Sequence, residues 1–282
     1  MKKGLVLEGG AMRGMFTAGA TDVMMENNIV FDGAVGVSAG AAFGCNYKSG
    51  QIGRAIRYNL RFARDKRYCS MWSLIFTGNL YSEKFCYHTV PEKLDIFDLE
   101  AFNKNPMEFY LVATDVTTGK PVYKKLENCD TSCFDWVRAS SSLPLVAKIV
   151  EIDGYKLLDG GIVDSIPIKF AESVGYDKNI VILTQPRSFV KEKSSSMSAM
   201  KFVLKKYPKV LEAIERRHIV YNETLEYIKK REAEGKVLVL SPPETLPIKR
   251  VEHNPEILKQ VYETGRKTAE ENLGKIKEFL KD

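Results

Sequence analysis

The stretch A-V-G-V-S-A-G-A, residues 34–41, contains the pentapeptide G-V-S-A-G. Its flanks predict a buried strand that ends just before Ser38 and a helix that begins just after it. This context is typical of a nucleophile elbow, in which a serine is held on a tight strand-to-helix turn. Gly36 and Gly40 provide the small neighbours that such a crowded turn requires. The pentapeptide also occurs by chance, so its meaning depends on the partner groups elsewhere in the chain.

Apolar runs alternate with helical patterns around this stretch. Strands are predicted within 5–10, 31–38, 155–159, 179–186 and 236–244, and a hairpin over 109–125. Helices are predicted within 15–28, 39–50 and 52–68. This alternation predicts an α/β protein with three layers, α/β/α, around a mainly parallel sheet. We expect residues 1–186 to form the catalytic core, and residues 187–282 to be a mostly helical, basic region that completes or caps it.

Composition narrows the class of protein. Of the 282 residues, 44% are hydrophobic and 28% are charged, as in ordinary globular proteins. No apolar run reaches the roughly 18 residues of a membrane span, and the start is interpreted as a strand rather than an export signal. Five cysteines without a C-x-x-C pair predict reduced thiols in a cytoplasmic protein and no metal site. The net charge of +6 is compatible with an anionic lipid surface, and no nucleic-acid partner is predicted.

The first predicted strand runs into E-G-G-A-M-R-G, residues 8–14. A glycine-rich turn at a helix N-terminus exposes backbone N–H groups to an anion. A dinucleotide phosphate is one candidate, but Ala11 replaces the third-position glycine of that fingerprint and no G-K-[ST] follows. An oxyanion hole, with Arg13 as a nearby cation, is the other. A plain structural turn also fits.

A carboxylate partner for Ser38 is available in D-G-G, residues 159–161. Asp159 at a strand end before two glycines fits a turn, or a carboxylate held open beside another group. The usual base for a serine is histidine, and the chain has three: His88, His218 and His253. None follows a predicted strand in the place of a hydrolase base. We interpret His88 as packed, His218 as solvated and His253 as part of a helix start.

In this order, G-G-A-M-R-G, G-V-S-A-G and D-G-G resemble the motifs of the patatin-like phospholipase family, bacterial type. The family pattern is G-G-G-x-[KR]-G, then G-x-S-x-G, then D-G-[GA]. Residues 113–123 and 139–144 also look like family segments, and the resemblance covers about residues 4–185. Ala11 is the departure, since the family has a third glycine there.

The resemblance implies a serine–aspartate dyad, with Ser38 the nucleophile and Asp159 the base. It also implies an oxyanion hole within 9–14, formed by Gly9, Gly10, Ala11, Arg13 and Gly14, and support from Gly36, Gly40, Gly160 and Gly161. No cofactor or metal is expected. The expected reaction is hydrolysis of fatty-acyl esters of phospholipids or lysophospholipids through an acyl-enzyme. An acyltransferase or thioesterase using the same dyad, and a non-catalytic lipid- or nucleotide-binding module, are the alternatives.

Two basic amphipathic segments, 52–76 and 201–218, raise the question of membrane contact. The first combines arginines with Trp72, Leu74, Ile75 and Phe76, a mixture typical of interfacial patches. Amphipathic helices also commonly pack on their own protein, so both uses remain open. The expected partner is a lipid or acyl ester, with peripheral contact at the inner face of the membrane.

Overall fold

The computed structural model of the protein describes residues 1–281. Within them, an eight-stranded mixed sheet has the order β5-β6-β3-β2-β1-β7-β8, with β4 paired to β3. The pairs β3–β2, β2–β1, β1–β7 and β7–β8 are parallel, and the pairs formed by β4, β5 and β6 are antiparallel. The strands are β1 (Lys3–Leu7), β2 (Gly33–Val37), β3 (Glu108–Asp115), β4 (Lys120–Lys125), β5 (Val150–Ile152), β6 (Tyr155–Asp159), β7 (Lys178–Ile182) and β8 (Val237–Leu240).

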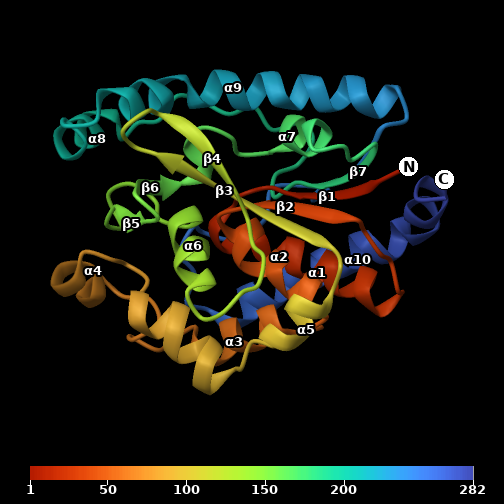
Figure 1. The fold of residues 1–282 in the computed structure, drawn as a ribbon, viewed down its shortest axis with the longest axis horizontal. Helices are drawn as coiled ribbons and strands as arrows, with labels where there is room; N and C mark the ends of the chain where they lie inside the picture. The colour runs from red at the N-terminus through yellow and green to blue at the C-terminus, as the bar shows by residue number, and fades with distance from the viewer. Residues whose placement is uncertain (282) are drawn as a thin grey trace.

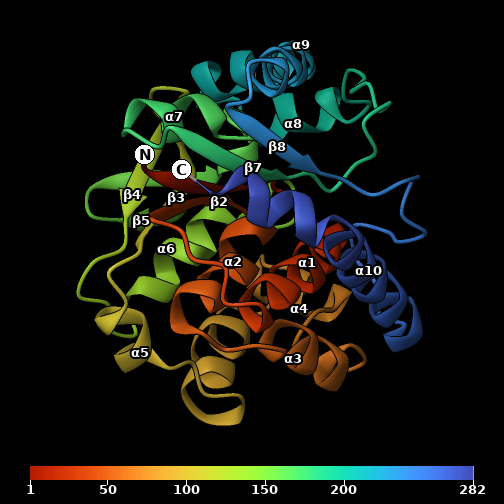
Figure 2. The same ribbon diagram turned by 90° about the vertical axis from the view of Figure 1, so that its right-hand side faces the viewer.

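Helices cover both faces of this sheet, which confirms the predicted three-layer α/β/α fold. Figures 1 and 2 show α7 and α9 on one face and α1, α2 and α10 on the other, with α3 outside them. The helices are α1 (Gly14–Glu26), α2 (Ala39–Ser49), α3 (Arg54–Phe62), α4 (Met71–Thr77), α5 (Leu99–Lys104), α6 (Cys133–Ser140), α7 (Ile168–Ser173), α8 (Met197–Val203), α9 (Pro208–Ala233) and α10 (Pro255–Phe279). A π-helical segment, Phe85–Leu94, lies between α4 and α5.

Strand β1 illustrates why the central strands are continuously apolar. Leu5 and Leu7 belong to the core beneath α1, α2 and α10, whereas Val6 belongs to the core beneath α7 and α9. Successive side chains of a strand point to opposite faces, and both faces are covered here. Every position of the strand interior is therefore buried.

The C-terminal part of the chain shares this core. Strand β8 extends the sheet by pairing with β7, and α10 packs along α1. Helix α9 begins at Pro208, after α8 ends at Val203.

One expectation about the cysteines is wrong. Cys129 and Cys133 are joined by a disulfide between β4 and α6, whereas Cys45, Cys69 and Cys86 are free thiols. Their spacing matches no recognised cysteine motif, so the sequence offered no sign of the pairing. As for membrane spans, none of the helices within residues 1–281 has the length and apolar character that crossing a bilayer requires.

Candidate active site

Two strands meet end to end along one edge of β3. Strand β2 runs parallel to β3 and pairs Val37 with Val112, whereas β6 runs antiparallel and pairs Asp159 with Ala113. The opposite edge of β3 is taken by β4. Because Val112 and Ala113 are consecutive, the ends of β2 and β6 are neighbours. Ser38 directly follows Val37, so this register brings Ser38 beside Asp159.

Ser38 occupies a strained turn between β2 and α2. Its φ of 54° and ψ of −120° lie in a region that side-chain-bearing residues avoid, at a cost of about 1–3 kcal/mol. The flanking glycines permit the turn: a Cβ on Gly36 would lie 2.5 Å from the carbonyl oxygen of Gly40, and one on Gly40 would lie 2.4 Å from that of Leu7. Helix α2 begins at the next residue, as expected for a nucleophile elbow.

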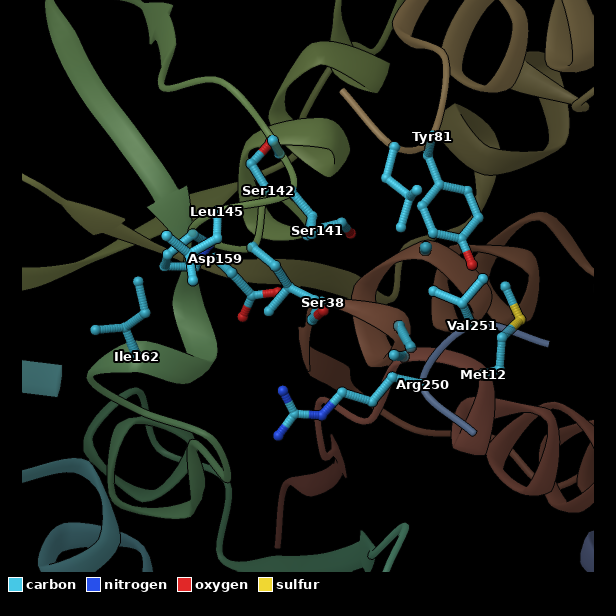
Figure 3. Close-up of a pocket in the computed structure, with 18 of the residues that line it drawn as sticks. Met12, Ser38, Tyr81, Ser141, Ser142, Leu145, Asp159, Ile162, Arg250 and Val251 are labelled. Carbon is cyan, nitrogen blue, oxygen red and sulfur yellow. The ribbon is translucent and has the colours of Figure 1, made fainter. Parts of the chain in front are cut away.

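Asp159 ends β6 as a buried carboxylate that is only 2% exposed. Its Oδ1 accepts a hydrogen bond from the N–H of Gly161 at 2.8 Å, whereas Oδ2 is buried with no hydrogen-bond partner within residues 1–281. Figure 3 shows the side chains of Ser38 and Asp159 next to one another. Burial raises the pKa of Asp159, and the nearby Ser38 hydroxyl and the charge of Arg217 oppose that rise. The raised pKa makes this carboxylate a stronger base than one in water.

A second serine holds the elbow against β3. The Ser140 hydroxyl accepts the N–H of Ser38 at 2.9 Å and donates to the carbonyl oxygen of Val112 at 2.6 Å. Gly160 packs onto the same carbonyl, where an added Cβ would lie only 2.1 Å from the oxygen. The carbonyl oxygen of Val112 therefore contacts both turns: it bonds to the Ser38 turn through the Ser140 hydroxyl and packs against Gly160 of the Asp159 turn.

The loop between β1 and α1 lies beside Ser38. The N–H groups of Gly10 and Ala11 have no hydrogen-bond partner within residues 1–281, whereas the N–H of Met12 donates to the carbonyl oxygen of Arg250 at 3.4 Å. Ala11 lines the cavity around Ser38 and has a φ of 49°. The residue that departs from the family pattern thus occupies a backbone conformation that favours glycine.

The other residues of the predicted oxyanion loop, Gly9, Gly10, Arg13 and Gly14, do not line the cavity. Gly9 packs closely against Ser38, because a Cβ added to this glycine would lie 3.2 Å from the Ser38 Cβ. Gly14 packs closely against Ala39, whose Cβ would lie 2.8 Å from an added Cβ. The Nε of Arg13 is buried and makes no hydrogen bond to any residue that the structure describes. Burial lowers the pKa of Arg13, while the charge of Glu8 opposes the change.

The side chain of Glu8 holds the loop between β1 and α1 in place through two hydrogen bonds. It accepts hydrogen bonds from the N–H of Thr184 at 2.5 Å and from the hydroxyl of Tyr221 at 2.7 Å. Through these bonds one buried carboxylate connects the loop to the end of β7 and to α9.

Ser38 and Asp159 both line a cavity of about 930 Å³. This is the upper end of the range of about 300–1,000 Å³ typical of small-molecule sites. Its walls are largely aromatic and aliphatic, and include Tyr68, Leu80, Tyr81, Val90, Val137 and Ile162. The π-helical segment supplies part of this wall through Tyr87, Val90 and Pro91. No group of three or more metal-binding side chains occurs within residues 1–281.

The C-terminal region contributes cavity-lining side chains that were not predicted from the sequence. Arg217, His218 and Arg250 all line the cavity, so the interpretation of His218 as solvated is wrong. A signal for Arg217 was present in α9: the stripe that faces the core consists of Val210, Ile214, Arg217, Tyr221, Thr224 and Ile228, at helical spacing. An arginine on an otherwise mostly apolar stripe indicates a buried role. Nothing in the sequence around Arg250 indicates one.

Comparison with known proteins identifies the family. The sequence model described as "Patatin-like phospholipase" matches residues 5–172, more than half of the chain. The chain belongs to the patatin-like phospholipase family. The predicted class of enzyme, a lipid acyl hydrolase, is thereby confirmed at the level of the family. A second model, "Domain of unknown function (DUF6363)", matches residues 207–281, which include α9 and α10.

Individual curated proteins and one solved structure are similar to this patatin-like chain. "Uncharacterized protein YjjU" of Escherichia coli is 32% identical over 190 residues, which cover 64% of this chain and 52% of that protein. "Lysophospholipase NTE1" of Pyricularia oryzae is 31% identical over 183 residues, which cover 62% of this chain and 11% of that protein. Among solved structures, VipD from Legionella pneumophila aligns with a TM-score of 0.48 and 14% identity over 97% of this chain and 67% of that one. The chain spans about half the length of YjjU and much less of NTE1.

Proposed function

We propose that the protein hydrolyses fatty-acyl esters of phospholipids or lysophospholipids through an acyl-enzyme on Ser38. The observation that carries the proposal is that a strained serine and a buried carboxylate line the same largely apolar cavity, and that Oδ2 of the carboxylate makes no hydrogen bond to the described part of the chain. The apolar walls suit an acyl chain. Family membership and the resemblance to a lysophospholipase support the same assignment.

The mechanism begins with proton transfer from the Ser38 hydroxyl to Oδ2 of Asp159. The serine oxygen attacks the ester carbonyl, and the negative charge that develops on the carbonyl oxygen is stabilised by the N–H groups of Gly10 and Ala11. Asp159 then protonates the departing alcohol, which leaves the acyl group on Ser38. Water attacks this ester while Asp159 takes its proton. Asp159 then passes that proton to the Ser38 oxygen as the acyl–oxygen bond breaks, which releases the fatty acid and restores both residues.

The geometry favours Asp159 over a histidine as the base. His88 lies 3.2 Å from Glu92, and the Nδ1 of His253 lies 2.8 Å from the carbonyl oxygen of Ala63; neither lines the cavity. His218 does line it and therefore needs a direct test. Under the proposal, His218→Ala retains the ability to form the acyl-enzyme.

Peripheral membrane contact is part of the proposal, with α4 as the contacting element. The predicted basic helix over 52–68 turns its apolar face inward, since Ala55, Tyr58 and Phe62 of α3 are buried. Helix α4 instead has no buried residue, and its Trp72 and Phe76 are 61% and 75% exposed. The two rings stack with centroids 5.5 Å apart, and α4 precedes the cavity-lining residues Asn79–Tyr81. An exposed aromatic pair of this kind suits insertion among lipid headgroups.

A lipid-panel assay tests the function. The purified protein is incubated with a phospholipid, its lysophospholipid and a triacylglycerol, and released fatty acid is measured with and without an added alcohol acceptor. We expect free fatty acid from the phosphate-bearing lipids and none from the Ser38→Ala variant. Ser141→Ala, which changes another serine of the cavity, is the matched control and should retain activity. Transfer to the alcohol instead of water would replace the hydrolase by a transferase.

A further inference from the structure

The cavity carries an excess of positive charge. Its acidic lining residues are Asp159 and Glu192, and its cationic ones are Arg54, Arg138, Lys191, Lys193, Arg217 and Arg250. Two of these cations are neutralised by carboxylates outside the cavity: Arg54 lies 3.3 Å from Asp95, and Arg138 lies 3.0 Å from Glu83. The other four cations form no ion pair within residues 1–281.

Arg217 reaches the dyad from α9. Its Nε donates to the carbonyl oxygen of Gly161, which fixes the guanidinium next to the Asp159 turn. The remaining N–H groups of the guanidinium have no protein acceptor within the described residues. Arg217 is thus held in place with most of its donors unused.

Arg250 reaches the same space from the segment before α10. Its backbone carbonyl accepts the N–H of Met12 at 3.4 Å, which ties it to the loop beside Ser38. In Figure 3 its side chain extends toward the space next to Ser38 and Asp159, and its guanidinium makes no hydrogen bond to the described residues. Two arginines from different elements therefore converge beside the dyad.

Lys191 completes the cluster from the segment before α8. Its ammonium group lies 4.2 Å from the ring centroid of Tyr221. Burial, and then the positive charges of Arg217, Arg13 and Arg250, lower the pKa of Lys191 to about 8, while Glu8 opposes the change. Cations gathered at this density repel one another, and a bound anion would relieve the repulsion.

We propose that Arg217 and Arg250, with Lys191, form a phosphate subsite that holds the substrate's phosphate group beside the dyad. Guanidinium groups bind phosphate through paired N–H donors, and a phosphate presents enough oxygens to accept from two arginines that approach from different sides. In a phospholipid, the phosphate is separated from the acyl ester by only the glycerol backbone, so both groups fit one cavity. The subsite gives a role to the region that matches a domain of unknown function: it supplies substrate recognition to the patatin-like site.

The inference rests on the proposed function only for the lipid character of the ligand, so it is tested in two arms. In the binding arm, Ser38→Ala protein is titrated with lysophosphatidylcholine, and then with inorganic phosphate or glycerol phosphate as competitor. In the kinetic arm, kcat/KM is measured for lysophosphatidylcholine and for the monoacylglycerol of the same acyl chain. Both arms compare Arg217→Gln and Arg250→Gln with Arg216→Gln and Lys249→Gln, which remove one charge from exposed neighbouring positions outside the cavity.

Loss of charge-assisted hydrogen bonds should weaken lysophospholipid binding about 10- to 100-fold in each arginine variant. The ratio of kcat/KM for lysophospholipid to that for monoacylglycerol should fall by a similar factor, while the two neighbouring variants keep the wild-type ratio. If inorganic phosphate competes with the lipid, the subsite also accepts free phosphate. If lipid binding depends on Arg250 but inorganic phosphate does not compete, the subsite is specific for the phosphate of the lipid headgroup.

An equal loss on both substrates, or no loss on either, would overturn the phosphate subsite even if the protein is an active hydrolase. If no ester is cleaved, the proposed function fails, but the binding arm still tests the subsite. Arg250 is exposed, so Arg250→Gln should fold; unfolding measurements on Arg217→Gln, with Arg217→Lys as the charge-conserving variant, separate a folding defect from a binding defect.

Discussion

Replacing Asp159 by asparagine should greatly slow turnover while making the protein more stable. Asparagine keeps the oxygen that accepts the Gly161 N–H at 2.8 Å, so the turn should be preserved. It cannot take the Ser38 proton, and loss of a general base slows reactions about 10²- to 10⁴-fold. We expect kcat for acyl-ester hydrolysis to fall by at least about 100-fold.

The gain in stability follows from the raised pKa of Asp159. A carboxyl group whose pKa is higher in the folded state binds its proton more tightly there, so it adds most stability below its unfolded pKa of about 4. That contribution is lost as the pH rises through the folded pKa. The melting temperature of Asp159→Asn should therefore exceed that of the wild type at pH 7, and the difference should shrink toward pH 4. For the same reason, the acid limb of the wild-type kcat/KM profile should lie above pH 4.

Asp164→Asn provides the matched control. This carboxyl group lies five positions further along, accepts a hydrogen bond from the Tyr123 hydroxyl at 2.9 Å and also has a pKa raised by burial, but it does not line the cavity. Its asparagine variant should retain turnover. A kcat for Asp159→Asn within about tenfold of the wild type, or an equal loss in Asp164→Asn, would refute the assignment of the base.

Three further predictions concern the surroundings of the dyad. Ser140→Ala removes the acceptor of the Ser38 N–H, which should lower the free energy of unfolding by about 1–3 kcal/mol in denaturant titrations and reduce kcat; an unchanged melting curve would contradict it. Ala11→Gly relieves a positive φ, so it should retain activity and raise the free energy of unfolding by up to about 1 kcal/mol, and destabilisation would count against that reasoning. Replacing Trp72 and Phe76 by serine should weaken sedimentation with anionic vesicles at least about tenfold, and unaltered binding would remove α4 from the membrane contact.

The fold and the two residues proposed as the dyad, Ser38 and Asp159, could be predicted because their signals are local. The apolar strands, the glycine turns and the motifs around Ser38 and Asp159 are each carried by a few adjacent residues, and the sheet confirms the strands. The register that places Val37 and Asp159 opposite consecutive residues of β3 could not be read from the sequence, because it depends on which strand edges meet.

The cationic side of the cavity could not be predicted from the sequence for the same reason. Arg217 and Arg250 are far from Ser38 in the chain, and only the packing of α9 and of the segment before α10 brings them to the cavity. Arg13, the cation expected there, is instead half-buried and does not line the cavity. The disulfide between Cys129 and Cys133 likewise depends on how the chain turns between β4 and α6.

The most direct test of the central claim is covalent labelling of the folded protein with a fluorophosphonate, followed by intact-mass and peptide analysis. Such probes react with activated serines, and the cavity also contains Ser141 and Ser142 as unactivated internal references. We predict a single adduct on Ser38 that is absent from Ser38→Ala, greatly slowed in Asp159→Asn and retained in Ser141→Ala. No adduct on the folded wild-type protein, or an adduct that persists in Ser38→Ala, would contradict the account.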